Sequence, residues 1–238
     1  MEAKAAYRRV LLKISGEALA GAKQHGLDFE IMRSVCGAVK RCVELGAQVG
    51  IVVGAGNFWR GVKDGGGKME RTRADQMGML ATAMNALALV DVVEQLGVEA
   101  TVMTALDMPR VADPYTRRGA EAALRSGKVV IFGCGTGSPF FSTDTGAALK
   151  AAEIGADALL LAKNIDGVYS ADPRTNPDAV KYERISYEEV LAQRLAVMDS
   201  TATSLAMDND IPVLVFALAD PENIVRAVCG EAIGTLVE

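Results

Sequence analysis

The chain has 238 residues, half of them hydrophobic and 23% charged, with a formal net charge of −5. This composition fits a globular protein with a sizeable core, and the acidic balance argues against a general nucleic-acid-binding protein. The single histidine, His25, and four cysteines without a C-x-x-C pair exclude most zinc sites and any catalytic triad that lacks His25. Because the N-terminus runs straight into a predicted strand, we expect no signal peptide and a cytoplasmic protein with reduced cysteines.

The first predicted strand contains a lysine in an apolar run. Residues 10–14 are typical of a buried parallel strand, but Lys13 interrupts them, and Ser15 and Gly16 follow immediately. A buried lysine is costly unless an anion lies beside it, and the backbone N–H groups of a Ser-Gly turn can face the same anion. The alternative is an exposed lysine on an edge strand. Glycine-rich turns further along the chain favour the anion site.

Strand-like and helix-like segments alternate along the whole chain. Further strands are predicted at residues 48–53, 98–103, 128–132, 157–162 and 213–216. Helices are predicted at residues 29–45, 71–96, 117–126, 143–154 and 186–195, the last starting with a capping box, Ser186 to Glu189. This alternation predicts a mostly parallel sheet with helices on both faces and a ligand site beyond the carboxyl ends of the strands.

Two segments stand out from this regular pattern. Residues 77–93 are apolar on all sides, which predicts a helix buried all round, in part at a subunit interface. Asn85 and Asp91 interrupt this segment, and it is too short for a convincing membrane span. The polar connection 167–184 carries Pro173 and Pro177 and suits a lid over a ligand.

Two glycine-rich turns follow predicted strands. In the first, Gly54 and Gly56 let the backbone approach a phosphate closely, and Arg60 offers a fork of donors to its oxygens. In the second, the run 133–144 leads hydroxyl groups and one carboxylate into a helix N-terminus, where anions are favoured. The alternative for each is an ordinary strand-to-helix turn, the second capped by Thr143 or Asp144.

These turns do not match the common nucleotide fingerprints. The Walker A pattern requires glycine where this chain has Val62 before Gly67-Lys68 and Ala122 before Gly127-Lys128. The dinucleotide-binding pattern requires a third glycine where the two turns carry Trp59 and Ser138. The chain is therefore neither a P-loop enzyme nor a standard dinucleotide-binding protein.

Two further positions carry candidate ligand-binding groups. Asp75, at the start of the long apolar helix, could accept hydrogen bonds from sugar hydroxyls, or act as an N-cap or first-turn acid. Lys163 ends a predicted strand and could reach a phosphate, while Tyr169 could support a base. Asp166-Gly167 and Asp172-Pro173 are equally good turn formers, which leaves this segment ambiguous by itself.

Five segments occur along the chain in a fixed order, namely LLKISGEAL, VVGAGNFWRG, DQMGMLATAMNALAL, GTGSPFFSTD and DGVYSADP. Together they resemble the bacterial uridylate (UMP) kinases of the amino-acid kinase superfamily, over the range from Tyr7 to Gly234. The resemblance implies a three-layer αβα sandwich with a mostly parallel central sheet, of the amino-acid kinase or carbamate kinase type. Residues 1–238 would form one such domain, binding UMP in its N-terminal part and ATP in the part from about residue 157.

The resemblance also implies a role for each matching residue. Lys13, Arg60 and Asp144 would be catalytic. The residues expected at ATP are Lys13, Ile14, Ser15, Gly16, Gly56, Arg60, Lys163, Asn164, Tyr169 and Asp172. Those expected at UMP are Ala55, Asp75, Thr136, Gly137, Ser138, Pro139, Phe140, Phe141, Ser142 and Thr143. Mg²⁺ would accompany ATP, with no protein side chain assigned as its ligand, and the assembly would be a homohexamer without nucleic-acid or membrane partners.

The sequence departs from the family pattern at two of these positions. Many relatives have Gly where this chain has Ala55, and a methyl group there requires a negative φ. Many have Asn where this chain has Ser138, whose hydroxyl reaches less far. A basic cluster that serves GTP activation in some relatives has no counterpart here, because the corresponding stretch 86–101 holds no Lys or Arg.

The expected reaction is transfer of the γ-phosphoryl group of ATP to UMP. Such transfer depends on alignment and charge neutralisation, for which Lys13, Lys163 and Arg60 are suited. Asp144 would orient the lysines, and no base is needed because the UMP phosphate is already largely ionised. Two alternatives stay open: a carboxylate or carbamate kinase of the same superfamily, and a non-catalytic nucleotide- or oxyanion-binding protein on this fold.

Overall fold

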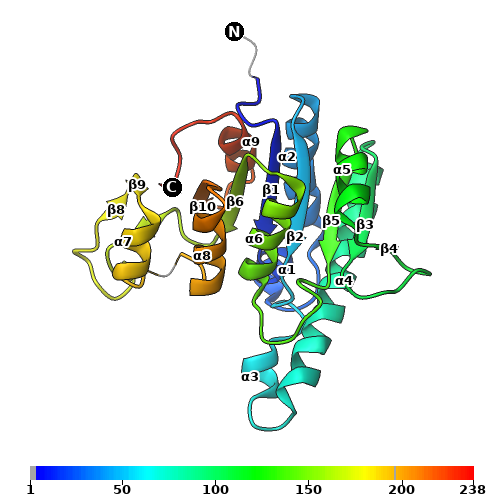
Figure 1. The fold of residues 1–238 in the computed structure, drawn as a ribbon, viewed down its shortest axis with the longest axis horizontal. Coiled ribbons are helices and arrows are strands. Elements are labelled where there is room, and N and C mark those ends of the chain that lie inside the picture. The colour runs from blue at the N-terminus through cyan, green and yellow to red at the C-terminus, as the bar shows by residue number, and fades with distance from the viewer. Residues whose placement is uncertain (1–3, 196) are drawn as a thin grey trace.

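The computed structural model describes residues 4–195 and 197–238 and centres on one twisted nine-stranded sheet (Figure 1). In spatial order its strands are β4 (Asp113–Pro114), β3 (Ala100–Thr104), β5 (Val129–Gly133), β2 (Gln48–Val53), β1 (Arg9–Ile14), β6 (Ala158–Lys163), β10 (Val213–Ala217), β11 (Thr235–Val237) and β9 (Arg184–Ile185). Neighbouring strands are parallel except β10 and β11, which are antiparallel. The predicted, mostly parallel sheet is confirmed.

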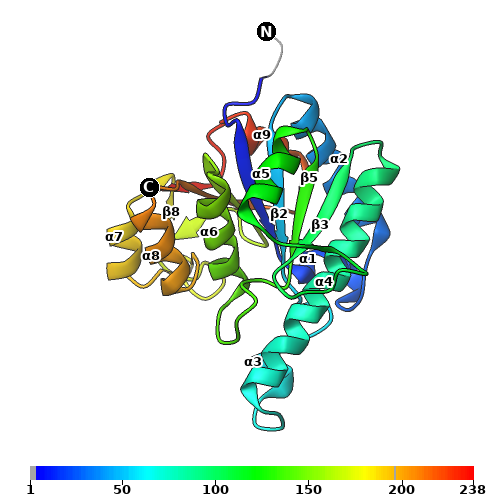
Figure 2. The same ribbon diagram turned by 45° about the vertical axis from the view of Figure 1, so that its right-hand side comes forward.

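Helices cover both faces of the sheet (Figures 1 and 2). One face carries α2 (Phe29–Glu44), α4 (Arg71–Gln95) and α9 (Glu222–Val228), and the other carries α5 (Arg117–Arg125), α6 (Thr143–Ile154) and α8 (Ser200–Asp208). Shorter elements are α1 (Gly16–Ala20), the 3₁₀ turn η1 (Gly21–Lys23), α3 (Gly61–Gly65) and α7 (Tyr187–Ala192). The result is the expected three-layer αβα sandwich.

Alternation along β1 divides its side chains between the two layers. Val10, Leu12 and Ile14 belong to the core under α2, whereas Leu11 belongs to the core under α6. Lys13 has the same parity as Leu11, so its side chain faces α6. Because β1 pairs with β2 on one side and β6 on the other, Lys13 lies in the centre of the sheet with 9% of its surface exposed. The alternative of an exposed lysine on an edge strand is therefore wrong.

Local signals in the sequence locate most helix starts. Helix α7 has the predicted capping box, in which Ser186 accepts from the Glu189 N–H and Glu189 accepts from the Ser186 N–H. Helix α6 begins at the predicted residue, but its cap is Ser142, whose Oγ accepts from the Thr145 N–H at 3.0 Å. Capping by Thr143 or Asp144 was therefore wrong, and Asp144 is free for another contact.

The connection 167–184 contains structure of its own. Strands β7 (Val168–Tyr169) and β8 (Lys181–Tyr182) pair antiparallel as a separate hairpin. The buried Thr235 of β11 joins this hairpin to the large sheet, because its hydroxyl accepts from the Val168 N–H at 2.8 Å and donates to the Tyr182 carbonyl.

Helix α4 is half buried and half exposed. By length and composition alone it could cross a membrane, but a single such helix is weak evidence, and half of its most apolar stretch is buried within the fold. All-round burial is not observed, because α4 presents an exposed apolar stripe at helical spacing. The stripe consists of Met77, Leu80, Met84 and Leu87.

The lone histidine and the cysteines lie as the composition suggests. His25 is exposed and contacts the edge of the Phe58 ring. The four cysteines are free thiols; Cys36, Cys42 and Cys134 are buried, and Cys229 is partly buried. Burial raises the pKa of Cys36 and of Cys42 to about 12, which keeps these thiols protonated and unreactive.

Candidate active site

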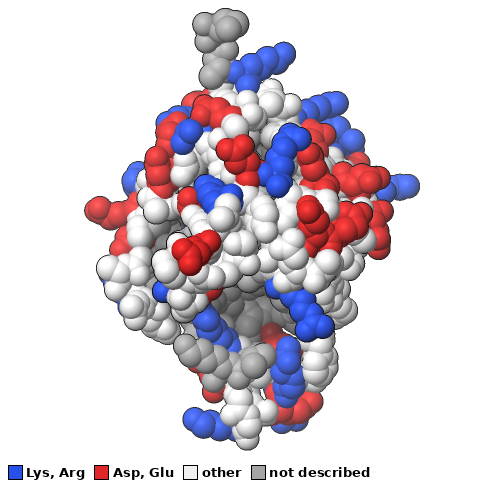
Figure 3. All heavy atoms as spheres, turned by 90° about the vertical axis from the view of Figure 1, so that its left-hand side faces the viewer, with Lys and Arg blue, Asp and Glu red and all other residues white. Residues whose placement is uncertain are grey.

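Two cavities lie at the carboxyl end of the sheet and meet at β1. The first, about 540 Å³, is bordered by the turns after β1, β2 and β5 and by α4. The second, about 730 Å³, is bordered by the turn after β6, the β7–β8 hairpin and the segment after α7. Lys13, Ser15 and Glu17 line both cavities. The molecule is also visibly hollowed on the side of α7 and α8, with Lys and Arg side chains at the edge of the hollow (Figure 3).

Three charged side chains lie together where the cavities meet: Lys13 lines both, Lys163 lines the second, and Asp144 lines neither but contacts both lysines. The Lys13 Nζ lies 2.7 Å from Asp144 Oδ1, and the Lys163 Nζ lies 3.9 Å from Asp144 Oδ2. Asp144 comes from the first turn of α6, and Lys163 from the end of β6, next to β1. Asp144 Oδ1 is buried and has no well-aligned hydrogen bond within the described residues, so its contact with Lys13 is an ion pair. One carboxylate therefore holds two ammonium groups side by side.

The environment of Lys163 weakens its hold on its proton. Burial lowers the pKa of Lys163 below its ordinary value of 10.5, and the nearby Lys13 lowers it further, while Asp144 and Asp199 act in the opposite direction. The Lys163 ammonium also donates to the Val197 carbonyl. Additional negative charge in the cavity would therefore stabilise the protonated form of Lys163.

The turns after β1 and β2 pack against each other with almost no free space. A Cβ atom on Gly16 would lie 2.5 Å from Asn57 Oδ1 and 2.6 Å from the Gly54 carbonyl oxygen. The buried Asn57 and Asn85 side chains bond to each other in both directions, and Asn85 donates to Gly54 O at 2.7 Å. Glycine is therefore required at position 16 by close backbone approach.

Arg60 lies at the outer end of the second turn. Its guanidinium forms an ion pair with Glu17 of α1, and its side chain lines the first cavity beside Gly56 and Trp59. The Trp59 indole donates to the Ala74 carbonyl of α4 at 2.8 Å, which fixes the turn to the long helix. The guanidinium is thus at the mouth of the first cavity, where it can meet an anion.

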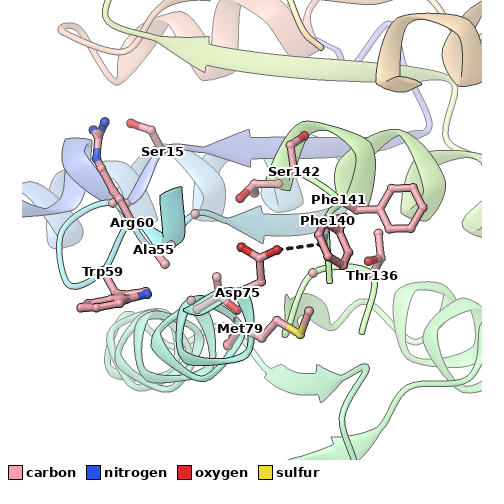
Figure 4. Close-up of a pocket in the computed structure, with 18 of the residues that line it drawn as sticks. Ser15, Ala55, Trp59, Arg60, Asp75, Met79, Thr136, Phe140, Phe141 and Ser142 are labelled. Carbon is pink, nitrogen blue, oxygen red and sulfur yellow. Dashed lines mark hydrogen bonds between the residues drawn. The ribbon is translucent and has the colours of Figure 1, made fainter. Parts of the chain in front are cut away.

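The far wall of the first cavity is the loop between β5 and α6 (Figure 4). The Phe140 N–H donates to Asp75 Oδ2 at 2.8 Å, and Figure 4 shows the Asp75 carboxylate pointing toward this loop. Asp75 lies in the second turn of α4, whose N-cap is Glu70, so neither the N-cap nor the first-turn alternative for Asp75 holds. Cys134 and Phe140 have φ values of 65° and 72°, a conformation that side chains other than glycine rarely adopt and that often marks functional sites.

Ala55 and Ser138 are the two positions at which the sequence departs from the family pattern. Ala55 has no positive φ, which meets the condition for a methyl group at this position. The Ser138 N–H donates to Thr136 Oγ1 at 3.2 Å, and both residues line the first cavity.

The second cavity has one wall made by the hairpin. The Tyr169 hydroxyl donates to Asp166 Oδ1 at 2.9 Å, and the Lys181 ammonium lies 2.9 Å from Asp166 Oδ2. Asp172 at the cavity edge is held by Arg174, which lowers the pKa of this exposed carboxyl to about 2. The cavity is therefore lined on this side by the oriented ring of Tyr169 and by the charged pair of Asp172 and Arg174.

Most of the predicted site residues lie at one of the two cavities. Of those expected at UMP, the first cavity is lined by Ala55, Asp75, Thr136, Ser138, Phe140, Phe141, Ser142 and Thr143. Of those expected at ATP, the second is lined by Lys13, Ser15, Lys163, Asn164, Tyr169 and Asp172. Gly16, Gly56 and Arg60 line the first cavity. Gly137 and Pro139 line neither, and the Ile14 side chain is buried in the core, although its carbonyl accepts from the Gly54 N–H at 2.9 Å.

Several site residues have no counterpart in the sequence-based prediction. Glu17, Trp59 and Arg71 line the first cavity. Asp199 caps α8 and also accepts from Ser142 and Thr145, which joins α8 to the start of α6. An Asp before Ser-Thr-Ala is a recognisable N-cap signal, but its contact with Ser142, 57 residues earlier, depends on the tertiary fold.

This geometry suits the transfer of an anionic group between two bound ligands. Two cavities of ligand size share Lys13 in their lining, Lys163 lines the second, and glycine-rich turns expose backbone at the first. Within residues 4–195 and 197–238, no three His, Cys, Asp or Glu side chains gather as a cluster that could hold a metal ion. Lysine and arginine side chains supply positive charge at the two cavities.

Known proteins are similar to this chain in sequence and in fold. Residues 8–217 match the model of the amino acid kinase family. The crystal structure of UMP kinase from Bacillus anthracis has 38% sequence identity and a TM-score of 0.94, covering 98% of this chain and 96% of its own. UMP kinase from Ureaplasma parvum has 36% identity and a TM-score of 0.92, covering 97% and 98%. Uridylate kinase from Archaeoglobus fulgidus has 31% identity and a TM-score of 0.74, covering 96% and 99%.

Proposed function

Since this chain belongs to the amino acid kinase family and is similar to its UMP kinases over nearly its whole length, we propose that it transfers the γ-phosphoryl group of ATP to UMP, giving UDP and ADP. The observation that carries the proposal is the meeting of two cavities at Lys13, with Asp144 and Lys163 beside it. Two nucleotides that enter from opposite sides would bring their phosphates together at this junction.

UMP occupies the first cavity in this proposal. The Asp75 carboxylate accepts from the sugar, and the run 136–143 borders the base and the sugar. Arg60 and the Ala55 turn line the same cavity as Lys13, and the UMP phosphate would lie among them. The side chain of Ser138 supplies one hydroxyl to this wall.

ATP occupies the second cavity as its Mg²⁺ complex. Tyr169 lies in the cavity wall as a surface for the adenine, with Asn164 and Asp172 nearby. Lys13 and Lys163 lie at the inner end, where the γ-phosphate would be. Mg²⁺ would enter with ATP as part of the substrate and would neutralise part of the negative charge of the phosphate oxygens.

The chemistry requires alignment and charge neutralisation. Negative charge spreads over the oxygens of the moving phosphoryl group, and cations aimed at those oxygens lower the barrier. Lys13 and Lys163 supply two such charges, and Arg60 supplies a third from the acceptor side. Asp144 holds the two lysines at their separation, and the UMP phosphate needs no base because it is already largely ionised near neutral pH.

The apolar stripe on α4 suits assembly with further copies of this chain. Leu80 and Met84 are each 52% exposed, and they lie in line with Met77 and Leu87 on one side of the helix. A run of large apolar side chains in contact with water is unfavourable, and a second copy would cover it. We also propose that the chain forms a homohexamer and is located in the cytoplasm.

The proposal is tested by the choice of phosphoryl acceptor. The purified chain is given MgATP with UMP, CMP, acetylglutamate or carbamate, and ADP release is followed in a coupled assay. UMP is expected to be preferred by a wide margin, with UDP formed in equal amount to ADP. A flat profile or one led by a carboxylate or carbamate contradicts UMP phosphorylation, and the lack of acceptor-dependent ADP release contradicts an enzyme of this kind.

A further inference from the structure

The carboxylate of Asp75 is held from three directions before any nucleotide binds. Arg71 Nε donates to Oδ1 at 2.9 Å and to Oδ2 at 2.7 Å from one helical turn earlier in α4. The Phe140 N–H donates to Oδ2 at 2.8 Å from the loop across the cavity (Figure 4). At Gly61 an added Cβ atom would lie 2.7 Å from Oδ1, so the start of α3 closes the third side. These contacts fix the direction in which the carboxylate faces the cavity.

Arg71 also holds the loop that supplies the Phe140 N–H. Its guanidinium carbon lies 5.1 Å from the centre of the Phe140 ring, within the range of a cation–π contact. Phe140 has a φ of 72° and a side chain that is two-thirds exposed, so its own burial does little to hold this unfavourable backbone conformation. One side chain therefore contacts both the carboxylate and the residue that donates to it.

We propose that Arg71 is a positioning residue: it orients the Asp75 carboxylate toward the sugar hydroxyls of the acceptor nucleotide. The inference rests on the proposed function, in which Asp75 accepts from the sugar of UMP. Arg71 itself need not touch the nucleotide, although it lines the same cavity. Its role is to keep the carboxylate and the loop at Phe140 in one arrangement.

This role predicts an effect on sugar selection. A carboxylate in a fixed direction can accept from both the 2′ and the 3′ hydroxyl of a ribose, and a deoxyribose leaves one acceptor position unpaired. A carboxylate that can rotate freely makes weaker bonds to both hydroxyls and discriminates less between the two sugars. Loss of Arg71 is therefore expected to weaken UMP more than dUMP, and to leave ATP unaffected.

The experiment compares Arg71→Ala and Arg71→Lys with Arg73→Ala in steady-state kinetics with UMP, dUMP and ATP. Arg73 is a matched control, because it lies on the same helix, its side chain is 76% exposed and it pairs with Glu70 alone among the described residues. For Arg71→Ala, the KM for UMP is expected to rise by about 10- to 100-fold, which is the size expected when a charged hydrogen bond is lost. The change in kcat should be smaller, and the KM for ATP should not change. The preference for UMP over dUMP, as a ratio of kcat/KM, falls in the same variant.

The lysine variant keeps the proposal testable if Arg71→Ala does not fold. Lysine keeps the positive charge but lacks the fork of donors and the planar group over Phe140, so an intermediate KM and an intermediate UMP preference are expected. Arg71 is not a positioning residue for the sugar if its variants behave like Arg73→Ala. The same conclusion follows if the variants lose kcat, UMP affinity and ATP affinity together while the preference for UMP over dUMP stays unchanged. A wild-type protein that does not phosphorylate UMP contradicts the proposed function itself, which separates the two failures.

Discussion

At the scale of single residues, the candidate site depends on two partly buried lysine ammonium groups that share one carboxylate. Lys13 and Lys163 both face Asp144, and Asp199 is the other acidic group that acts on Lys163. Such an arrangement is costly in an empty, partly buried site and becomes favourable when phosphate oxygens enter. Burial above all, and the nearby Lys13 in addition, lowers the pKa of Lys163, which makes the charge of that residue sensitive to pH.

The pKa of Lys163 leads to a prediction for the pH dependence of kcat/KM for ATP, which reports on the free enzyme. Because the pKa lies below 10.5, Lys163 loses its proton at a lower pH than an ordinary lysine, and kcat/KM for ATP falls as the pH rises through that value. Lys163→Arg should move this alkaline fall to higher pH, since arginine stays protonated. The exposed Lys23 serves as the control, and Lys23→Arg should leave the profile unchanged. An alkaline fall that is identical in Lys163→Arg would mean that another group titrates.

At the scale of elements, the site is made by two strand-to-helix turns that touch. Gly16 follows β1 and packs against the turn after β2, which in turn is joined to α4 through the Asn57–Asn85 pair. This packing brings the ends of β1 and β2 and the side of α4 into one rigid wall. Substitutions in the turn therefore act on stability and on the cavity together.

Gly16→Ala tests this coupling. The added methyl group would overlap with the Gly54 carbonyl and Asn57 Oδ1, so we expect a loss of about 1 to 3 kcal/mol in the free energy of unfolding and a large loss of activity. The control is Gly37→Ala in α2, where an added Cβ meets nothing within 4 Å and where alanine should stabilise the helix by about 0.5–1 kcal/mol. Chemical denaturation and the UMP-dependent assay measure both effects. An unchanged stability and activity for Gly16→Ala would contradict the tight packing of the turns.

The elements also show how far sequence patterns reach. Long segments with clear periodicity were predicted well, as for β2, which has the predicted bounds, and α6, which begins and ends at the predicted residues. The hairpin of β7 and β8 was missed because each strand has two residues, too few for an alternation to be visible. Helix α9 and strand β11 were missed too, and they have seven and three residues. Helix α8 was missed despite its nine residues, although the N-cap Asp199 precedes it, because that cap was not recognised in the sequence.

Site residues could be predicted from the sequence where they belong to a recognisable motif. They could not be predicted where only the tertiary fold brings them to the site. Lys13 and Asp144 lie 131 residues apart in sequence, and their contact follows from the parity of β1 and the position of α6 above it. Arg71 and Asp199 belong to no motif that was recognised. Asp199 accepts from Ser142 of another element, whereas Arg71 donates to Asp75 in its own helix and contacts the Phe140 ring across the cavity. The charge pair Arg71 and Asp75 at a spacing of four in a predicted helix was the one available signal.

At the scale of the whole molecule, the candidate site and the apolar stripe of α4 belong to the same helix. Asp75 and Met79 line the first cavity, while Leu80 and Met84 point away from the fold. Assembly through the stripe would therefore place a neighbouring copy directly behind the acceptor cavity. Covering the stripe would also stiffen the helix that carries Asp75.

Leu80→Glu tests whether the stripe is an interface. A charge in the middle of a buried apolar contact is unfavourable, so the variant is expected to form smaller species than the wild type in analytical ultracentrifugation. Val180→Glu is the matched control, because Val180 is 64% exposed, also apolar and far from α4 in the sequence. Equal sedimentation of Leu80→Glu and the wild type would show that α4 is not the interface.

The most direct test of the account is phosphoryl transfer by Lys13→Met, which keeps the length of the side chain and removes its charge. Lys23→Met is the control, and calorimetry with UMP shows whether the acceptor cavity is intact. We predict that Lys13→Met binds UMP nearly as the wild type does, while UDP formation falls by about 100-fold or more, the size expected for one lost transition-state contact. Wild-type turnover in Lys13→Met would contradict the claim that Lys13 neutralises the phosphoryl group between the two nucleotides.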